Sequence, residues 1–238
     1  MPAANRYTLA FLTAHPDDET FMGAVAIREA VEQGHRVVLL LATDGEAGKS
    51  GRLQPMERPE LAALRRQEMA RAAAVLGVAE VRWLGHPDGG LAAVAPGWLR
   101  AQAAQFMRET AADVVVTFPE DGISGHKDHT AIHHAVREAV HAGECPSVRK
   151  LYYAASPPLL ASGHLPAVRI DVAPRWPLKR AALLAHESQI LSIERVFGPL
   201  GDASTIEPRM REEQFVLAWA DGVSFPVRSE SSLFDGLG

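Results

Sequence analysis

Short apolar runs alternate with longer helical patterns through the first two-thirds of the sequence, and this alternation limits the possible folds most strongly. The apolar runs are rich in Val and Leu and do not alternate strictly with polar residues, which is typical of strands buried on both faces. They comprise Tyr7–Thr13, Arg36–Thr43, Glu80–Leu84 and Asp113–Phe118. Helical patterns lie between them, at Thr20–Gln33, Pro59–Leu76 and Pro96–Thr110. The repeated strand–helix order predicts an α/β fold, with a doubly wound, mostly parallel sheet and helices on both faces.

The pattern loosens after a helix expected at His129–His141, and proline-rich joints separate the remaining pieces. We expect further strands in "VRKLYYA" and "AVRIDV", a helix at Leu178–Leu191 and a last strand in "EEQFVLA". We interpret residues 1–238 as one domain with a decorated C-terminal portion and a core of about residues 7–220. The tail, residues 227–238, is expected to be poorly ordered.

The composition indicates a globular protein and argues against several kinds of partner. Hydrophobic residues make up 47% of the chain, which is ample for a core. The net charge of −5 and the lack of a Lys and Arg run argue against a nucleic-acid partner. The single cysteine, Cys145, excludes an internal disulfide and a thiolate-rich zinc site, and it is typical of a reducing cytosol. With neither a secretory pattern nor a membrane-length apolar run, we expect a cytoplasmic protein without membrane insertion; a homo-oligomer is open.

One histidine and three carboxylates follow the first predicted strand, in the stretch "AHPDDETF". Carboxylates so close together repel one another, so a helix N-terminus, an arginine or a metal ion should compensate them. In the simplest interpretation, Asp17 or Asp18 caps the following helix and the helix dipole favours Glu19. Capping accounts for one carboxylate, however, and leaves His15 unexplained.

A second polar cluster follows another predicted strand, in "VVVTFPEDGISGHKDHTAIHHA". Because the carboxyl ends of parallel strands emerge at one edge of a sheet, both clusters can meet there. His15, Asp18 and His129 would then supply the three protein ligands of a catalytic zinc ion, which keeps one open position for water. Asp17 would remain free to act on that water. The i, i+4 spacing of His129 and His133 leaves His133 open as an alternative ligand.

Five motifs, in order within residues 7–190, resemble the LmbE-like, or PIG-L, family of zinc-dependent de-N-acetylases. They are "AHPDDE", "TDGEAG", Arg65 with Glu68 before "LGV", "LGHPDGGL" and "SGHKDH", and a later "HESQ" also matches. That family acts on N-acetylglucosamine attached to a second group, and it includes the deacetylases of mycothiol and bacillithiol synthesis. Lys127 departs from the family pattern, which has proline there, and "MGAVA" replaces the more usual paired glycines.

Carried over by position, the resemblance implies a function for each polar residue of the two clusters. The implied metal ligands are His15, Asp18 and His129. Asp17 becomes the general base and a protonated His126 the residue that stabilises the oxyanion, with Asp128 as its orienter. The implied cofactor is Zn²⁺, and Fe²⁺ suits the same ligands. The metal and Asp17 would activate water for attack on an acetamide, which releases acetate and a free amine.

Three further residues are candidates for substrate contact. Under the resemblance, Glu46 would contact a sugar hydroxyl and Arg65 would anchor an anionic aglycone, while Asp88 is either a turn former or a substrate contact. The neighbouring loop "TDGEAGKS" approaches a phosphate-binding pattern, but Thr43 stands where that pattern requires glycine.

We therefore predict a Rossmann-like, metal-dependent hydrolase that removes the N-acetyl group from an N-acetylglucosamine conjugate, such as one of malate or inositol. Its partner would be this small-molecule substrate. One alternative is a metal-dependent hydrolase of another small amide. A nucleotide-dependent transferase that uses residues 43–51 is a second, and a binding protein that keeps the fold without turnover is a third.

Overall fold

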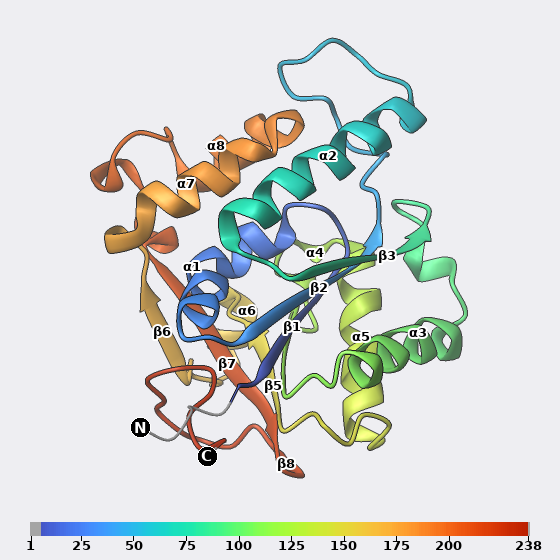
Figure 1. Ribbon diagram of the computed structural model, residues 1–238, viewed down its shortest axis with the longest axis vertical. Coiled ribbons are helices and arrows are strands. Elements are labelled where there is room, and N and C mark those ends of the chain that lie inside the picture. The colour runs from blue at the N-terminus through green and yellow to red at the C-terminus, as the bar shows by residue number, and fades with distance from the viewer. Residues whose placement is uncertain (1–5, 238) are drawn as a thin grey trace.

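The computed structural model describes residues 6–237, and eight strands of this part of the chain form one sheet (Figure 1). The strands are β1 (Thr8–Thr13), β2 (Arg36–Thr43), β3 (Glu80–His86), β4 (Val114–Thr117), β5 (Lys150–Ala154), β6 (Val168–Asp171), β7 (Glu212–Ala220) and β8 (Val223–Ser224). Their order is β3-β2-β1-β4-β5-β7-β6, with β8 paired to β7. Strands β1 to β5 run parallel, whereas β7 runs antiparallel to both β5 and β6.

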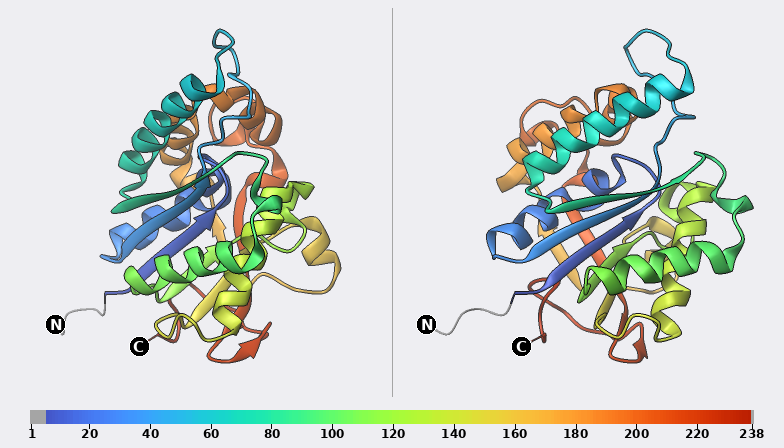
Figure 2. Two further views of the ribbon diagram at one scale, coloured as in Figure 1. Left: turned by 90° about the vertical axis from the view of Figure 1, so that its right-hand side faces the viewer. Right: turned by 45° about the vertical axis from the view of Figure 1, so that its right-hand side comes forward.

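Helices cover both faces of this sheet, as Figure 2 shows most clearly. The helices are α1 (Asp18–Glu32), α2 (Arg58–Leu76), α3 (Pro96–Glu109), α4 (Gly122–Gly125), α5 (Lys127–His141), α6 (Pro157–Ala161), α7 (Trp176–Ala185) and α8 (Ile190–Phe197). Helices α1, α2 and α7 lie on one face, and α3 and α5 lie on the other (Figures 1 and 2). The predicted α/β fold with a mostly parallel sheet is confirmed. Among the helices of residues 6–237, none combines the length and the apolar character that a membrane span requires.

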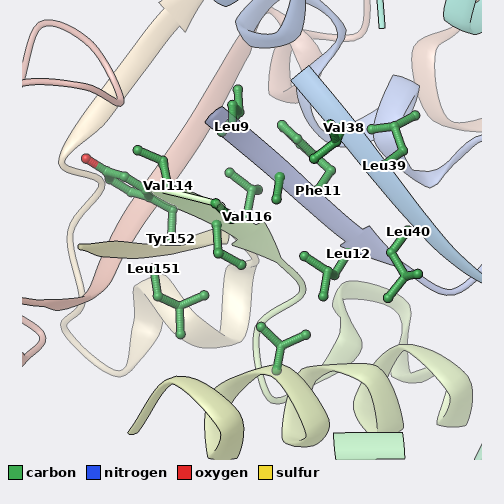
Figure 3. Close-up of a cluster of buried hydrophobic side chains, with 14 of the residues drawn as sticks. Leu9, Phe11, Leu12, Val38, Leu39, Leu40, Val114, Val116, Leu151 and Tyr152 are labelled. Carbon is green, nitrogen blue, oxygen red and sulfur yellow. The ribbon is translucent and has the colours of Figure 1, made fainter. Parts of the chain in front are cut away.

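The central strands lack polar alternation because both of their faces are buried. In β1, Leu9, Phe11 and Leu12 have no exposed surface (Figure 3). Successive side chains of a strand point to opposite faces, so both faces of β1 lie in the core. The predicted bounds of β2 agree with the structure, and the other three predicted parallel strands differ by at most two residues at either end.

The strand order creates a topological switch point between β1 and β4. From β1 the chain continues through β2 to β3 on one side, and it then returns to β4 on the other side of β1. The loops that follow β1 and β4 therefore diverge from the same edge of the sheet, which is where ligands bind in folds of this type. Both polar motifs of the sequence lie in these two loops.

Helix α1 is interrupted at Gly23, whose backbone angles of φ −156° and ψ 30° are not helical. A Cβ atom at this position would lie 2.6 Å from Cζ of Phe11 on β1, so a larger residue would push the helix away from the sheet. The "MGAVA" segment thus keeps a glycine at the point of closest approach.

A buried ion pair satisfies the backbone groups that the interruption leaves free. Glu213 of β7 accepts hydrogen bonds from the N–H groups of Val25 and Ala26, at 2.9 Å each. Nζ of Lys179 on α7 lies 2.6 Å from Oε1 of Glu213 and donates to the Phe21 carbonyl at 3.1 Å. The antiparallel strand β7 and helix α7 therefore hold α1, and with it the loop that precedes α1.

The helix expected at Leu178–Leu191 is divided in the structure into α7 and α8, with a short 3₁₀ turn, η3 (Glu187–Gln189), between them. His186 ends α7 with backbone angles of φ −91° and ψ 58°. The N–H and the hydroxyl of Ser188 both donate to the carboxylate of Glu68 on α2, at 2.7 and 2.6 Å. A contact with a distant helix thus breaks a helical pattern that continues in the sequence.

We expect a poorly ordered tail from the sequence, but the tail packs against the sheet from Glu230 onward, whereas Val227 is 96% exposed. Leu233 and Leu237 are each 3% exposed. Oε1 of Glu230 lies 2.8 Å from Nζ of Lys150 on β5, in an ion pair that is almost fully buried. Two apolar anchors and one buried ion pair, which no local pattern reveals, fix this segment.

Candidate metal centre

The loop after β1 turns so that its side chains face the loop after β4. Oδ2 of Asp18 accepts hydrogen bonds from the N–H groups of Ala14 and His15, at 3.2 and 2.7 Å. The other carboxylate oxygen, Oδ1, lies 3.3 Å from Nε2 of His129 on α5. Asp17, which directly precedes α1, makes no side-chain hydrogen bond to the helix N-terminus. Helix capping, the simplest interpretation of the motif, therefore does not account for this cluster.

The structure brings together the three residues proposed as metal ligands. Nδ1 of His15 lies 3.1 Å from Nε2 of His129, and it lies 3.6 Å from Oδ2 of Asp18. Two ligand atoms on a tetrahedral ion, each about 2.1 Å from it, are separated by about 3.4 Å. The spacing and the chemistry of the three side chains therefore suit one divalent cation.

Groups on the far side of each imidazole determine which nitrogen carries the proton. His129 donates from Nδ1 to the Gly122 carbonyl at 2.9 Å, so its Nε2 presents a lone pair to the cluster. Nε2 of His15 lies 3.0 Å from Asp88 Oδ1 and 3.5 Å from Asp128 Oδ2, but it makes no hydrogen bond within residues 6–237. The negative charge of these two carboxylates favours a proton on Nε2, and we assign it there. A histidine that donates its other ring N–H to a carbonyl, as His129 does, is the usual arrangement in metal sites.

The carboxylates of the cluster dominate its electrostatics. Burial lowers the pKa of His15, but three neighbouring carboxylates outweigh this effect and raise that pKa well above its ordinary value. Burial by itself would raise the pKa of Asp18, but His129 and His15 hold it well below its usual range. A bound dication would compensate this buried negative charge.

His126 lies beside the other two imidazoles, with its ring centroid 4.7 Å from that of His15 and 5.0 Å from that of His129. One nitrogen of each ring lies within 4.8 Å of the others, so spacing alone would allow His126 as a ligand. However, its Nδ1 accepts a hydrogen bond from the Asp128 N–H at 3.2 Å, which leaves the ring proton of a neutral imidazole on Nε2. A protonated Nε2 is a hydrogen-bond donor and not a ligand.

Asp17 lies next to the ligand set in a rare backbone conformation. Its angles are φ 120° and ψ −28°, and strain of this kind persists only where the surroundings enforce it. The Asp17 N–H donates to Oε2 of Glu19 at 3.3 Å, and the Asp17 carbonyl accepts the N–H groups of Thr20 and Phe21. Burial raises the pKa of the Asp17 carboxyl to about 6. A carboxyl with this pKa can both accept and return a proton near neutral pH.

Arg65 of α2 supports the Asp17 turn from behind and is only 3% exposed. Its guanidinium donates to the Gly45 carbonyl at 2.7 Å and to the Pro16 carbonyl, and its Nη2 lies 3.4 Å from Asp17 Oδ2. A Cβ atom at Gly45 would lie 2.1 Å from Nη1 of Arg65, so this close approach depends on glycine. The structure therefore places Arg65 against the turn and not in the open position that an anchor for an aglycone needs.

The carboxylate of Asp128 holds the loop after β3. It is fully buried and accepts hydrogen bonds from the N–H groups of Gly89 and Leu91, at 2.7 and 3.0 Å. Its remaining near contact is with Nε2 of His15. The contact that orients His126 comes from the backbone N–H of Asp128 and not from its side chain.

Glu46 and Asp88 join the loops after β2 and β3 by two reciprocal hydrogen bonds. Oε1 of Glu46 accepts from the Asp88 N–H at 2.8 Å, and Oδ2 of Asp88 accepts from the Ala47 N–H at 2.9 Å. Burial raises the pKa of Asp88, but the neighbouring His15 outweighs this and brings the pKa to about 2. Oε2 of Glu46 is buried, and it has no hydrogen-bond partner within residues 6–237.

Two supporting residues, Glu19 and His186, were missed or left open by sequence reasoning. Glu19, which we had linked only to the helix dipole, is fully buried and accepts the Asp17 N–H. His186 is also fully buried, with Nε2 3.5 Å from both Glu19 Oε1 and Thr20 Oγ1. Its positive charge would lower the pKa of Asp17. The "HESQ" match was the only sequence signal for His186.

Two alternatives raised by the sequence find no support in the structure. His133 donates from Nδ1 to the Phe118 carbonyl at 2.8 Å, and its ring packs against those of His134 and Tyr153. The loop at residues 43–51 does not open directly into a helix, because α2 begins only at Arg58. It therefore lacks the helix N-terminus that a phosphate-binding loop uses.

Comparison with known proteins identifies the family. Residues 10–140 match the family described as PIG-L, GlcNAc-PI de-N-acetylase. The chain belongs to this family. It is 30% identical over 217 residues to a Bacillus anthracis protein named "Probable N-acetyl-alpha-D-glucosaminyl L-malate deacetylase 2", a match that covers 87% of this chain and 93% of the relative. It is also 33% identical over 159 residues to the 1D-myo-inositol 2-acetamido-2-deoxy-alpha-D-glucopyranoside deacetylase of Kineococcus radiotolerans, covering 56% of this chain and 44% of that relative.

Solved structures share the fold of this PIG-L family member. The N,N'-diacetylchitobiose deacetylase from Pyrococcus horikoshii matches with a TM-score of 0.66 and 20% identity, over 88% of this chain and 83% of its own. The 4-carboxy-2-hydroxymuconate hydratase from Pseudomonas putida also matches with a TM-score of 0.66, with 19% identity over 93% of this chain and 99% of its own. Because a deacetylase and a hydratase share this fold, the activity has to be argued from the site.

Proposed function

We propose that this PIG-L family member is a metal-dependent N-deacetylase, which hydrolyses the acetamide of an N-acetylglucosamine conjugate to acetate and a free amine. The observation that carries the proposal is the convergence of His15, Asp18 and His129 beside a strained Asp17 and the donor His126. The names of the two relatives, one a malate-conjugate and one an inositol-conjugate deacetylase, support the same reaction.

In this proposal His15, Asp18 and His129 hold the cation. Three protein ligands leave one coordination position open, which distinguishes a catalytic site from a structural one. The ligand set of two imidazoles and one carboxylate suits Zn²⁺, which we propose, and it also suits Fe²⁺. A cation held by these residues would lower the pKa of a bound water molecule and would polarise the acetyl carbonyl oxygen.

Asp17 acts as the general base and then as the general acid. Its carboxylate accepts a proton as water attacks the acetyl carbon, and the same proton passes to the departing amine. The strained backbone and Arg65 keep the carboxylate beside the ligands instead of letting it cap α1. The base is therefore in place before the substrate arrives.

His126 stabilises the negative charge that develops on the acetyl oxygen. It donates from Nε2–H, because the Asp128 N–H occupies Nδ1 and fixes the ring. A positioned donor of this kind typically contributes ~3–4 kcal/mol to the transition state. The protonated His126 expected from the sequence is replaced here by a neutral imidazole that donates through Nε2.

Glu46 and Asp88 are proposed to bind the sugar. Oε2 of Glu46, which is buried and has no hydrogen-bond partner within residues 6–237, offers an acceptor for a hydroxyl group of the substrate. Asp88 positions Glu46 through its N–H, and its Oδ1 lies 3.0 Å from Nε2 of His15. Arg65 then acts on the substrate only through Asp17.

An acetate-release screen tests the proposal. N-acetylglucosamine conjugates of malate, inositol and other sugars are compared with acetamides that contain no sugar, and metal content is measured on the same sample. We expect acetate from the sugar conjugates, loss of release after chelation, and recovery with Zn²⁺ or Fe²⁺. Full turnover after exhaustive metal removal would reject the mechanism. Release from sugar-free acetamides alone would favour the first alternative, a metal-dependent hydrolase of another small amide. A cytoplasmic location stays a prediction, and a homo-oligomer stays open.

A further inference from the structure

A hollow of about 330 Å³ lies between the segment that follows β3, the start of α3 and one face of α5. Its lining is mainly apolar and includes Leu91, Val94, Leu99, Ala131 and Ala135. The charged side chains in the lining are Lys127 and Glu138. This hollow is separate from the ligand set, and none of the residues proposed above for catalysis lines it.

The hollow nevertheless borders the segment that carries His126, which we call the catalytic segment. Gly125 and Lys127 both line it, and they flank His126 in the chain. Consecutive Cα atoms lie 3.8 Å apart, so the rim begins about 4 Å along the chain from His126. On the opposite wall, the Leu91 N–H donates to the Asp128 carboxylate, which faces His15. A substrate whose acetamide lies at His126 can therefore extend over the exposed Gly125 into the hollow.

The sequence of α5 explains why this space is open. Lys127, Ala131, Ala135 and Glu138 recur at the spacing of one helix face, while His129 is turned toward the metal centre. Two alanines at the centre of this face leave room that larger apolar residues would fill. The face is thus apolar and concave in its middle and charged at its two ends.

The two charged side chains, Lys127 and Glu138, lie at opposite ends of the hollow. Lys127 forms no ion pair within residues 6–237, and it lies in the first turn of α5, where the helix dipole adds positive potential. Glu138 lies three turns further along, at the end away from His126. A ligand in the hollow would therefore place a negative group near the catalytic segment and an uncharged group at the far end.

We infer that this hollow binds the aglycone of the conjugate, and that the aglycone is an apolar group with an anionic substituent close to the sugar. The inference rests on the proposed deacetylase function and adds the class of substrate. Ligand pockets usually measure about 300–1,000 Å³, so a hollow at the lower end takes part of a conjugate and not the whole. The sugar would remain at the loops after β2 and β3.

A second copy of the chain is the competing occupant. Trp98, in the first turn of α3 beside the lining residues Pro96 and Leu99, is 60% exposed and could contact a partner. The substrate is favoured because the hollow continues directly from the catalytic segment and its unpaired positive charge, Lys127, lies at that end.

The test compares methyl, phenyl and 2-carboxyphenyl glycosides of N-acetylglucosamine. We expect kcat/KM to rise about tenfold from methyl to phenyl and about tenfold again with the carboxylate, at the low end of what one such contact contributes. Lys127→Met should remove only the second gain. Ala131→Leu, which fills the hollow, should remove both gains and leave the methyl glycoside unchanged. Arg137→Met and Ala101→Leu, at exposed positions on α5 and α3 outside the lining, are the matched controls.

A binding measurement gives a readout that does not depend on turnover. Calorimetry on metal-free protein should show 2-carboxyphenyl glycoside binding about tenfold weaker to Lys127→Met than to the Arg137→Met control. Equal affinities, or equal kcat/KM values for all three glycosides, would overturn the inference and leave the deacetylase function intact. Tight binding without acetate release from any metal-loaded sample would instead reject the function. If Ala131→Leu changes the size of the protein in solution but not the relative kcat/KM values, a second copy occupies the hollow and the inference is wrong.

Discussion

The buried ion pair at the interruption of α1 provides a quantitative test of how the fold supports the metal centre. Glu213→Ala removes the acceptor for the N–H groups of Val25 and Ala26 and also the partner of Lys179. Glu213 is 3% exposed and Lys179 1%, so water cannot replace the lost carboxylate. Removing one partner of a buried ion pair costs about 3–5 kcal/mol, and each N–H left unpaired adds about 1–3 kcal/mol.

The free energy of unfolding should therefore decrease by at least about 5 kcal/mol. This is a large part of the total for a typical domain, which is about 5–15 kcal/mol. The melting temperature should fall by about 10–20 °C. Urea and thermal unfolding followed by circular dichroism measure the change. The neighbouring Glu212 pairs with Arg169 at the surface, so the control Glu212→Ala should cost less than about 1 kcal/mol. A similarly small loss for Glu213→Ala would refute the reasoning.

Three further predictions concern the site and its surroundings. His129→Ala should lose both metal and activity, whereas Asp17→Asn should keep the metal and lose about 10²–10⁴-fold in kcat. Metal analysis and an acetate-release assay on both variants test this prediction. If Asp17→Asn contains no metal, Asp17 is a ligand and the assignment is reversed. Arg65→Met should lower kcat with little change in KM, since Arg65 acts through Asp17; a raised KM at unchanged kcat would make it a substrate anchor instead. Burial lowers the pKa of His133 from 6.5 to about 4, so between these values the unfolded chain binds a proton that the folded chain does not. Stability should therefore decrease by up to about 3 kcal/mol as the pH falls through this window. Urea unfolding of metal-free protein should show a weaker pH dependence in His133→Phe, and parallel curves would contradict the prediction.

The parallel strands could be predicted because burial on both faces leaves a direct mark on the sequence. β2 is apolar from Val37 to Ala42 without alternation, and every one of these side chains is fully buried. The strand–helix order then places the loops after β1 and β4 at one switch point, so the meeting of His15 and His129 follows from topology. For this reason the convergence of the two loops could be predicted from the sequence, while the ligand set stays a prediction.

Contacts between distant elements could not be predicted in the same way. Glu213 binds backbone groups 188 and 187 positions earlier in the chain, and no local pattern distinguishes it from the exposed Glu212. The burial of Arg65 depends on Gly45 in another loop, which the i, i+3 spacing of Arg65 and Glu68 does not reveal. The Glu230 and Lys150 ion pair that holds the tail is likewise a tertiary event. Each of these features requires the fold to be known before the partner can be identified.

The position of the cation itself gives the most direct test of the account. Crystals of the protein loaded with one equivalent of Zn²⁺ would be measured at the zinc absorption edge, and the anomalous difference map would locate the ion. We predict one strong peak about 2.0–2.2 Å from His15 Nδ1, His129 Nε2 and a carboxylate oxygen of Asp18. A peak on the other side of the His15 ring, among Nε2, Asp88 and Asp128, would contradict the account.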